Sequence, residues 1–175
     1  MSGRMVSVVA PVFNEEETAA RFVSRVNETF ARLSYDLEII LVDDGSDAPT
    51  VTVMERLASE VPNVTVLFLS RNFGHQAAIT AGIDYAQGDA VVTMDSDLQH
   101  PPETIPELLR LWEAGYDIVF TIRDEDEGVS AFKRVTSRWF YRVINALSET
   151  HIPQGAADFR LMRWGLILIP GTAAF

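Results

Sequence analysis

Short apolar runs alternate with longer segments of helical periodicity along most of the chain. Short runs bounded by turn-forming residues are typical of buried strands in a parallel sheet. Apolar residues at three- and four-residue spacing predict helices with one buried face. The expected strands are Val6–Phe13, Leu37–Val42, Val64–Leu69, Ala90–Met94 and Asp117–Ile122, and the expected helices are Glu15–Leu33, Pro49–Glu60, Gly74–Ala86 and Glu103–Glu113.

This alternation of strands and helices predicts an α/β fold: a Rossmann-like, mainly parallel sheet flanked by helices. The length of 175 residues fits one domain with a sizeable core. We find no linker and no internal repeat. In an open sheet of this kind, ligands bind at the carboxyl ends of the strands, so the residues that follow each strand are the candidates for function.

Composition and missing motifs exclude several classes of protein. The chain has no cysteine, which excludes disulfides, thiolate zinc sites and cysteine nucleophiles and fits a reducing, cytoplasmic setting. Its net charge of −11 argues against nucleic acid as a partner. No apolar stretch approaches the ~20 residues that span a bilayer, so we expect a soluble chain. Dinucleotide, P-loop, zinc-protease and α/β-hydrolase motifs are absent.

The stretch Val91–Pro102 carries the clearest chemistry. The apolar run of the fourth expected strand ends in Asp95-Ser96-Asp97-Leu98-Gln99, which offers three oxygen donors within five residues. Such donors suit Mg²⁺ or Mn²⁺, and magnesium commonly takes the rest of its ligands from water and substrate phosphates. The stretch therefore predicts a metal site for a phosphate-bearing substrate. The alternative is that Asp97 only caps the following turn.

Two other strand ends carry weaker signals. Asp43 and Asp44 follow the second strand and could accept hydrogen bonds from a base or a ribose, or could form an ordinary Asp-Gly turn. After the third strand, the segment Arg71–Gln76 offers backbone N–H groups and cationic side chains to the same site. His75 belongs to this segment, and on sequence alone we assign it no acid–base role.

The last third of the chain contains a basic segment. In Ala131–Leu147, Arg134, Arg138 and Arg142 recur at four-residue spacing beside an apolar stripe, and Lys133 and Ser137 form a similar pair. This face either binds an anion such as a phosphate or is simply solvated. Further on, Asp158 lies in an apolar setting and is either paired with a neighbouring arginine or functional.

Together these segments resemble the family 2 glycosyltransferases of the GT-A fold, specifically the polyprenyl-phosphate glycosyltransferases. The resemblance spans about residues 5–163, and residues 1–163 would form a C-terminally incomplete catalytic domain. Residues 164–175 form an apolar tail, and the family would continue beyond it with further catalytic and membrane-associated segments. The ordered segments are VSVVAPVFNEEET, IILVDDGSDAPT, LSRNFGHQAAITAGIDYAQGDAVVTMDSDLQHPPETIPELL, SAFKRVTSRWFYRVIN and ADFRLM.

The resemblance implies a role for each matching position. Asp158 matches the acid often proposed as catalytic base, and Asp97 is the second residue to which the resemblance gives a catalytic role. His100 stands where relatives often carry Asp or Asn. The implied nucleotide-sugar residues are Pro11, Phe13, Glu15 and Asp44 beside Asp43, Asn72, Gln76, Asp95 and Ser96; the metal-and-diphosphate residues are Asp95, Asp97 and Gln99; the acceptor-phosphate residues are Arg123, Lys133 and Ser137, with Arg134 beside them.

The implied reaction is an inverting, metal-dependent transfer of a sugar to a polyprenyl phosphate. The segment NFGHQAAITAG is more similar to the bacterial enzymes that act on undecaprenyl phosphate, which favours a UDP-sugar over GDP-mannose. A full-length relative would work at the inner face of the plasma membrane. Two alternatives stay open: a nucleotide-sugar-binding module without transferase activity, and a metal-dependent phospho- or nucleotidyltransferase. The sequence leaves the sugar and the oligomeric state open.

Overall fold

A six-stranded sheet forms the centre of the computed structural model, which describes residues 3–122 and 156–167. The strand order is β3-β2-β1-β4-β6-β5. β1 pairs in parallel with β2 and β4, β2 pairs in parallel with β3, and β6 runs antiparallel to β4. The strands are β1 (Met5–Val12), β2 (Asp36–Asp43), β3 (Val64–Phe68), β4 (Ala90–Thr93), β5 (Ile118–Ile122) and β6 (Ala156–Arg163).

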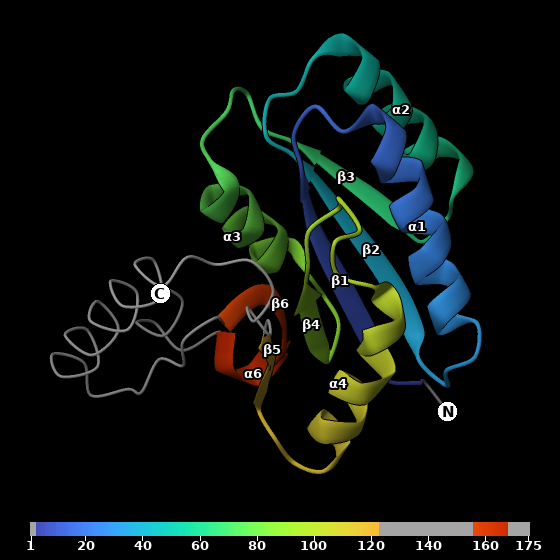
Figure 1. Ribbon diagram of the computed structural model, residues 1–175, viewed down its shortest axis with the longest axis vertical. Helices are drawn as coiled ribbons and strands as arrows, with labels where there is room; N and C mark the ends of the chain where they lie inside the picture. The colour runs from blue at the N-terminus through green and yellow to red at the C-terminus, as the bar shows by residue number, and fades with distance from the viewer. Residues whose placement is uncertain (1–2, 123–155, 168–175) are drawn as a thin grey trace, which may run out of the picture. The chain divides into compact units, whose positions relative to one another are not determined.

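Helices cover both faces of this sheet (Figure 1). α3 packs on one face, against β1 and β2, while α1, α2 and α4 lie on the other. The helices are α1 (Glu16–Phe30), α2 (Ala48–Glu60), α3 (His75–Tyr85), the 3₁₀ helix η1 (Pro102–Thr104), α4 (Ile105–Glu113) and α6 (Trp164–Ile167). None of the helices in the described part of the chain combines the length and the apolar character that crossing a membrane requires.

Buried apolar side chains of the interior strands and the helices form the core. Along α1, Phe22, Val23 and Val26 are buried, at the spacing that puts them on one helix face. On the α3 side, one cluster of buried apolar residues is formed by Val9, Ile40, Val42, Ala78, Ala86 and Val91. Because β1, β2 and β4 are covered on both faces, they are apolar along their length rather than alternating.

The mainly parallel α/β sheet predicted from the sequence is confirmed, and the predicted strand ends agree with the structure within two residues. Four details were wrong or missed. α1 ends at Phe30 rather than Leu33, where a turn follows. The segment expected as one helix over Glu103–Glu113 divides into η1 and α4, and Pro106 occupies the first turn of α4, where its missing N–H removes no helical hydrogen bond. The strand β6 and the short helix α6 were not predicted.

The chain divides by its internal contacts into two compact units, Met1–Val119 with Phe159–Phe175, and Phe120–Asp158. Every residue that lines the pocket described below belongs to the first unit. The basic segment identified from the sequence, including Arg134, lies outside the described residues.

The close packing of α3 on the sheet gives a first prediction. A methyl group added at Gly82 would lie 2.3 Å from Val9 Cγ1 and 2.9 Å from Val42 Cγ2. Gly82→Ala should therefore destabilise the protein by about 1–3 kcal/mol in urea unfolding, despite the better helix propensity of alanine. Gly165→Ala is the matched control, because nothing lies within 4 Å of the added methyl there. Equal stability of the two variants would contradict the packing described.

Candidate active site

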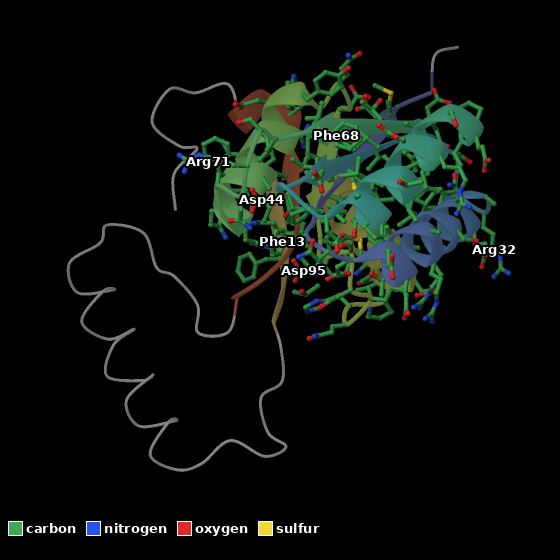
Figure 2. The ribbon with its side chains drawn as sticks, turned by 90° about the horizontal axis from the view of Figure 1, so that it is seen from above. Phe13, Arg32, Asp44, Phe68, Arg71 and Asp95 are labelled. Carbon is green, nitrogen blue, oxygen red and sulfur yellow. The ribbon has the colours of Figure 1, made fainter. Side chains whose placement is uncertain are left out.

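A pocket of about 540 Å³ opens at the carboxyl ends of β1, β2 and β4. Figure 2 shows Phe13, Asp44 and Asp95 gathered at this end of the sheet, with Arg32 on the far side. Parallel strands bring their carboxyl ends to one edge, so residues far apart in sequence meet there. The pocket is lined by Pro11, Val12, Phe13, Glu15, Asp44, Asn72, Gly74, His75, Asp95, Ser96 and Asp97.

Asp44 joins the end of β2 to the loop before α3. Its carboxylate is almost completely buried and accepts two backbone hydrogen bonds, from Phe73 N–H at 2.7 Å and from Gly74 N–H at 3.0 Å. Next to it, Gly45 has a φ of +74° and approaches the backbone of Arg71 so closely that a methyl group would lie 2.6 Å from the Arg71 carbonyl carbon. Glycine is therefore required at this contact.

The loops after β1 and β2 are also bound to each other. Asn14 N–H donates to Ser46 Oγ at 2.9 Å, and Asp47 N–H donates to Asn14 Oδ1 at 2.9 Å. Asn14 has a φ of +55°, a conformation that asparagine tolerates better than most residues. Asp43 is buried and accepts from Ser46 N–H within the turn. These contacts hold one wall of the pocket without any ligand.

The Asp95-Ser96-Asp97 segment forms another wall. Ser96 points inward: it is 2% exposed, and its hydroxyl donates to the Pro11 carbonyl oxygen at 2.9 Å. The carboxylates on either side of it line the pocket. Asp97 Oδ1 accepts from Gln99 N–H at 2.9 Å, across Leu98 with its φ of +62°. A buried serine between two acids thus turns both carboxylates toward the same space.

The donor set of this wall fits a hard divalent cation. Within the described ranges there is no group of three His, Cys, Asp or Glu side chains arranged to hold a metal by themselves. Asp95 and Asp97 offer two carboxylates on one pocket wall, and Mg²⁺ is commonly bound through one or two carboxylates with water and phosphate oxygens completing its coordination. These two residues would hold such an ion together with a phosphate-bearing ligand.

Three pocket residues, Val12, Gly74 and His75, were not among the predicted site residues, and of these only His75 has a polar side chain. His75 is the first residue of α3, lines the pocket, and places its Nε2 atom 3.5 Å from Asp95 Oδ1. The sequence contained a signal in the form of a histidine directly after a glycine at a helix start. The direction of the His75 side chain depends on the conformation of the loop that is bonded to Asp44, and the sequence did not reveal this conformation.

The structure places the predicted residues in three groups. Asp43, Gln76 and Gln99 are described but do not line the pocket: Asp43 is the buried last residue of β2, and Gln76 and Gln99 are exposed. Asp158 belongs to β6, but its side chain is outside the described part, as are Arg123, Lys133, Arg134 and Ser137 altogether. The predicted residues that line the pocket are Pro11, Phe13, Glu15, Asp44, Asn72, Asp95, Ser96 and Asp97.

His100, which the sequence analysis noted as a departure from the family, packs edge-on against Phe159.

The fold is that of the GT-A glycosyltransferases, as predicted. Glucosyl-3-phosphoglycerate synthase from Mycobacterium tuberculosis, in complex with Mn²⁺, UDP-glucose and phosphoglyceric acid, matches with a TM-score of 0.68 at 22% identity, over 94% of this chain and 58% of that chain. The mannosyltransferase PcManGT from Pyrobaculum calidifontis, in complex with GDP-Man and Mn²⁺, matches with a TM-score of 0.63 at 22% identity, over 94% of this chain and 46% of that one.

The profile of glycosyl transferase family 2 matches residues 7–175, and the chain belongs to this family. A prophage bactoprenol glucosyl transferase homolog of Escherichia coli is 42% identical over 157 residues, which cover 90% of this chain and 51% of that protein. The undecaprenyl-phosphate 4-deoxy-4-formamido-L-arabinose transferase of Pseudomonas fluorescens is 40% identical over 158 residues, 90% of this chain and 45% of that protein. The chain thus spans about half the length of these curated relatives.

The buried Asp44 carboxylate gives a second prediction. In Asp44→Asn, one of the two backbone N–H groups would face an amide NH₂ instead of an oxygen, so we expect a loss of about 2 kcal/mol in unfolding free energy. Asp47→Asn is the matched control. Asp47 caps α2 by accepting from Thr50 N–H, and asparagine caps a helix equally well. Equal unfolding free energies for the two variants would contradict the role assigned to Asp44.

Proposed function

We propose that the protein transfers a sugar from a nucleotide-sugar to a polyprenyl phosphate, with inversion at the anomeric carbon. Membership of glycosyl transferase family 2 supports the reaction class, and the names of the bactoprenol and undecaprenyl-phosphate relatives support the acceptor. We favour a UDP-sugar as donor and undecaprenyl phosphate as acceptor. The choice of a UDP-sugar rests on the segment Asn72–Gly82, because its sequence resembles the corresponding segment of the bacterial undecaprenyl-phosphate enzymes.

The observation that carries this proposal is the pair of pocket carboxylates at the end of β4. Asp95 and Asp97 lie on one wall of a pocket whose other walls come from the ends of β1 and β2. Two carboxylates on one wall repel a bare diphosphate and attract a divalent cation, so this pocket suits a nucleoside diphosphate that arrives with Mg²⁺ or Mn²⁺. Structural neighbours solved with Mn²⁺ and a nucleotide-sugar are consistent with this.

Each wall of the pocket has a function in donor binding under this proposal. Phe13 is 48% exposed at the pocket and offers an aromatic surface to the nucleoside. Asp44 uses its carboxylate for two backbone amides, and each oxygen retains a second lone pair that can accept from a base N–H or a ribose hydroxyl. Asp95 and Asp97 would hold a divalent cation, which would supply positive charge to the leaving diphosphate.

The transfer itself breaks one bond and forms one. A phosphate oxygen of the acceptor attacks the anomeric carbon, while the bond from that carbon to the donor diphosphate breaks and its electron pair leaves with the nucleoside diphosphate. An attack from the side opposite the leaving group inverts the configuration. Because the acceptor phosphate is already anionic at neutral pH, no strong general base is required. The predicted acceptor-binding residues, Arg123 and Lys133 among them, would balance its charge.

Metal-dependent donor binding followed by transfer tests the proposal. Titration with UDP and GDP by calorimetry, with and without Mn²⁺, should give tighter binding of UDP in the presence of the metal. Asp97→Asn should abolish the effect of Mn²⁺ and lower transfer of radiolabelled sugar to undecaprenyl phosphate by about 100-fold or more. Asp84→Asn is the matched control, since Asp84 is exposed on α3 and does not line the pocket.

The possible outcomes separate the alternatives. Metal-dependent UDP binding without any transfer would contradict the transferase proposal and favour a nucleotide-sugar-binding module. Transfer of a phosphoryl or nucleotidyl group instead of a sugar would favour the phosphotransferase alternative. Failure of both nucleotides to bind, with no effect of Asp97→Asn, would contradict the site assignment.

Asp158 gives a further prediction about the same reaction. Since the attacking phosphate needs no deprotonation, we expect Asp158 to act by position and charge rather than as a base. Asp158→Asn should then keep the transfer rate within about tenfold of the unchanged protein and leave the pH profile of kcat unshifted. A loss of several orders of magnitude, together with a shifted pH profile, would show that Asp158 removes a proton.

A further inference from the structure

His75 faces one of the two carboxylates proposed to hold the metal. Its Nε2 atom lies 3.5 Å from Asp95 Oδ1, and the two side chains are 41% and 32% exposed, so both reach the pocket. The distance is the outer limit of a hydrogen bond, and contacts of this kind are often long before a ligand is bound. The two residues come from different walls, since Asp95 follows β4 and His75 begins α3.

The position of His75 is set by the fold rather than by the ligand. The residue before it, Gly74, has a φ of +97°, and its N–H donates to the buried carboxylate of Asp44. The carbonyl oxygen of Gly74 accepts from the N–H groups of Ala77 and Ala78, which closes the first turn of α3. The start of the helix is thus bonded on both sides of His75, and the imidazole is carried on a rigid element.

A side chain in this position can orient a metal-binding carboxylate. Carboxylates that bind metals are commonly hydrogen-bonded by neighbouring groups, which fix their rotamer and tune their affinity. An N–H donor at one oxygen of Asp95 restricts rotation of the carboxylate and presents its other oxygen to the pocket. Because the Asp95 carboxylate is already ordered before the cation binds, less conformational entropy is lost on binding, and the affinity for the cation is higher.

We propose that His75 is a positioning residue that orients Asp95 for the divalent cation of the donor site. The inference rests on the proposed function, because it needs a cation that binds together with the nucleotide. It gives His75 no role in proton transfer, and it places the imidazole outside the direct coordination of the ion. It also explains why a histidine follows the glycine at the start of α3.

The test measures how Mn²⁺ strengthens UDP binding, by calorimetric titration of UDP over a series of Mn²⁺ concentrations. In His75→Ala, the Mn²⁺ concentration needed for half of the effect should rise about 10- to 100-fold. UDP binding without metal and the unfolding free energy should stay unchanged. His75→Gln should restore most of the effect, because a glutamine amide can donate from a similar distance. Thr80→Ala, on the same helix away from the pocket, is the control.

A double-mutant cycle with Asp95→Asn makes the test specific. If His75 acts through the Asp95 carboxylate, His75→Ala should have little further effect on the Mn²⁺ dependence once Asp95 is replaced. Additive effects would overturn the proposal, as would an unchanged Mn²⁺ dependence in His75→Ala or no recovery in His75→Gln. Weaker metal-free UDP binding in His75→Ala would also overturn it and would indicate direct contact with the nucleotide.

The same titration distinguishes failure of this proposal from failure of the proposed function. If the unchanged protein binds no UDP, or binds it without any effect of Mn²⁺, the metal-dependent donor site itself is wrong and the inference falls with it. If the unchanged protein shows the Mn²⁺ effect and His75→Ala shows the same effect, only the role of His75 is wrong.

Discussion

The buried carboxylate of Asp44 is the contact on which the rest of the site depends. A buried charge is costly unless it is hydrogen-bonded, and here two backbone N–H groups, of Phe73 and Gly74, satisfy it. Hydrogen bonds to a charged group contribute about 1.5–3 kcal/mol each, so this single side chain ties two loops firmly together. It determines where α3 begins, and therefore which side chains of that helix reach the pocket.

The four carboxylates of the pocket differ in their partners. Asp44 accepts from backbone amides, and Glu15 accepts from the hydroxyl of Thr18. Asp95 faces His75, and Asp97 accepts from the N–H of Gln99, two residues along the chain. The first two therefore stabilise the loops that form the walls, while the second two lie on the wall suited to a cation. All four carboxylates line the pocket, and Asp44 and Glu15 also hold its loops in place through hydrogen bonds to residues of other segments or of the first helical turn.

The sequence predicted the parallel part of the sheet well because its strands are covered on both faces and appear as uninterrupted apolar runs. β6 was missed because it has no uninterrupted apolar run: Phe159 and Leu161 are buried, but Arg160 lies between them and Asp158 precedes them. The pocket residues that directly follow strands were also predicted. The direction of a side chain in a loop was not, because it depends on contacts between loops distant in sequence. For this reason Gln99 was expected in the pocket and His75 was not.

Ser96 makes the pair of acids part of the sheet rather than of a flexible loop. Its hydroxyl is bonded to the Pro11 carbonyl oxygen in β1, an interior strand. A force on either carboxylate is therefore transmitted to a hydrogen-bonded strand, whose stiffness far exceeds that of a loop. The spacing between the acids and the opposite wall is consequently established when the sheet assembles. A ligand with fewer or more phosphate groups than a diphosphate would have to adapt to this spacing, because the protein has little freedom to change it.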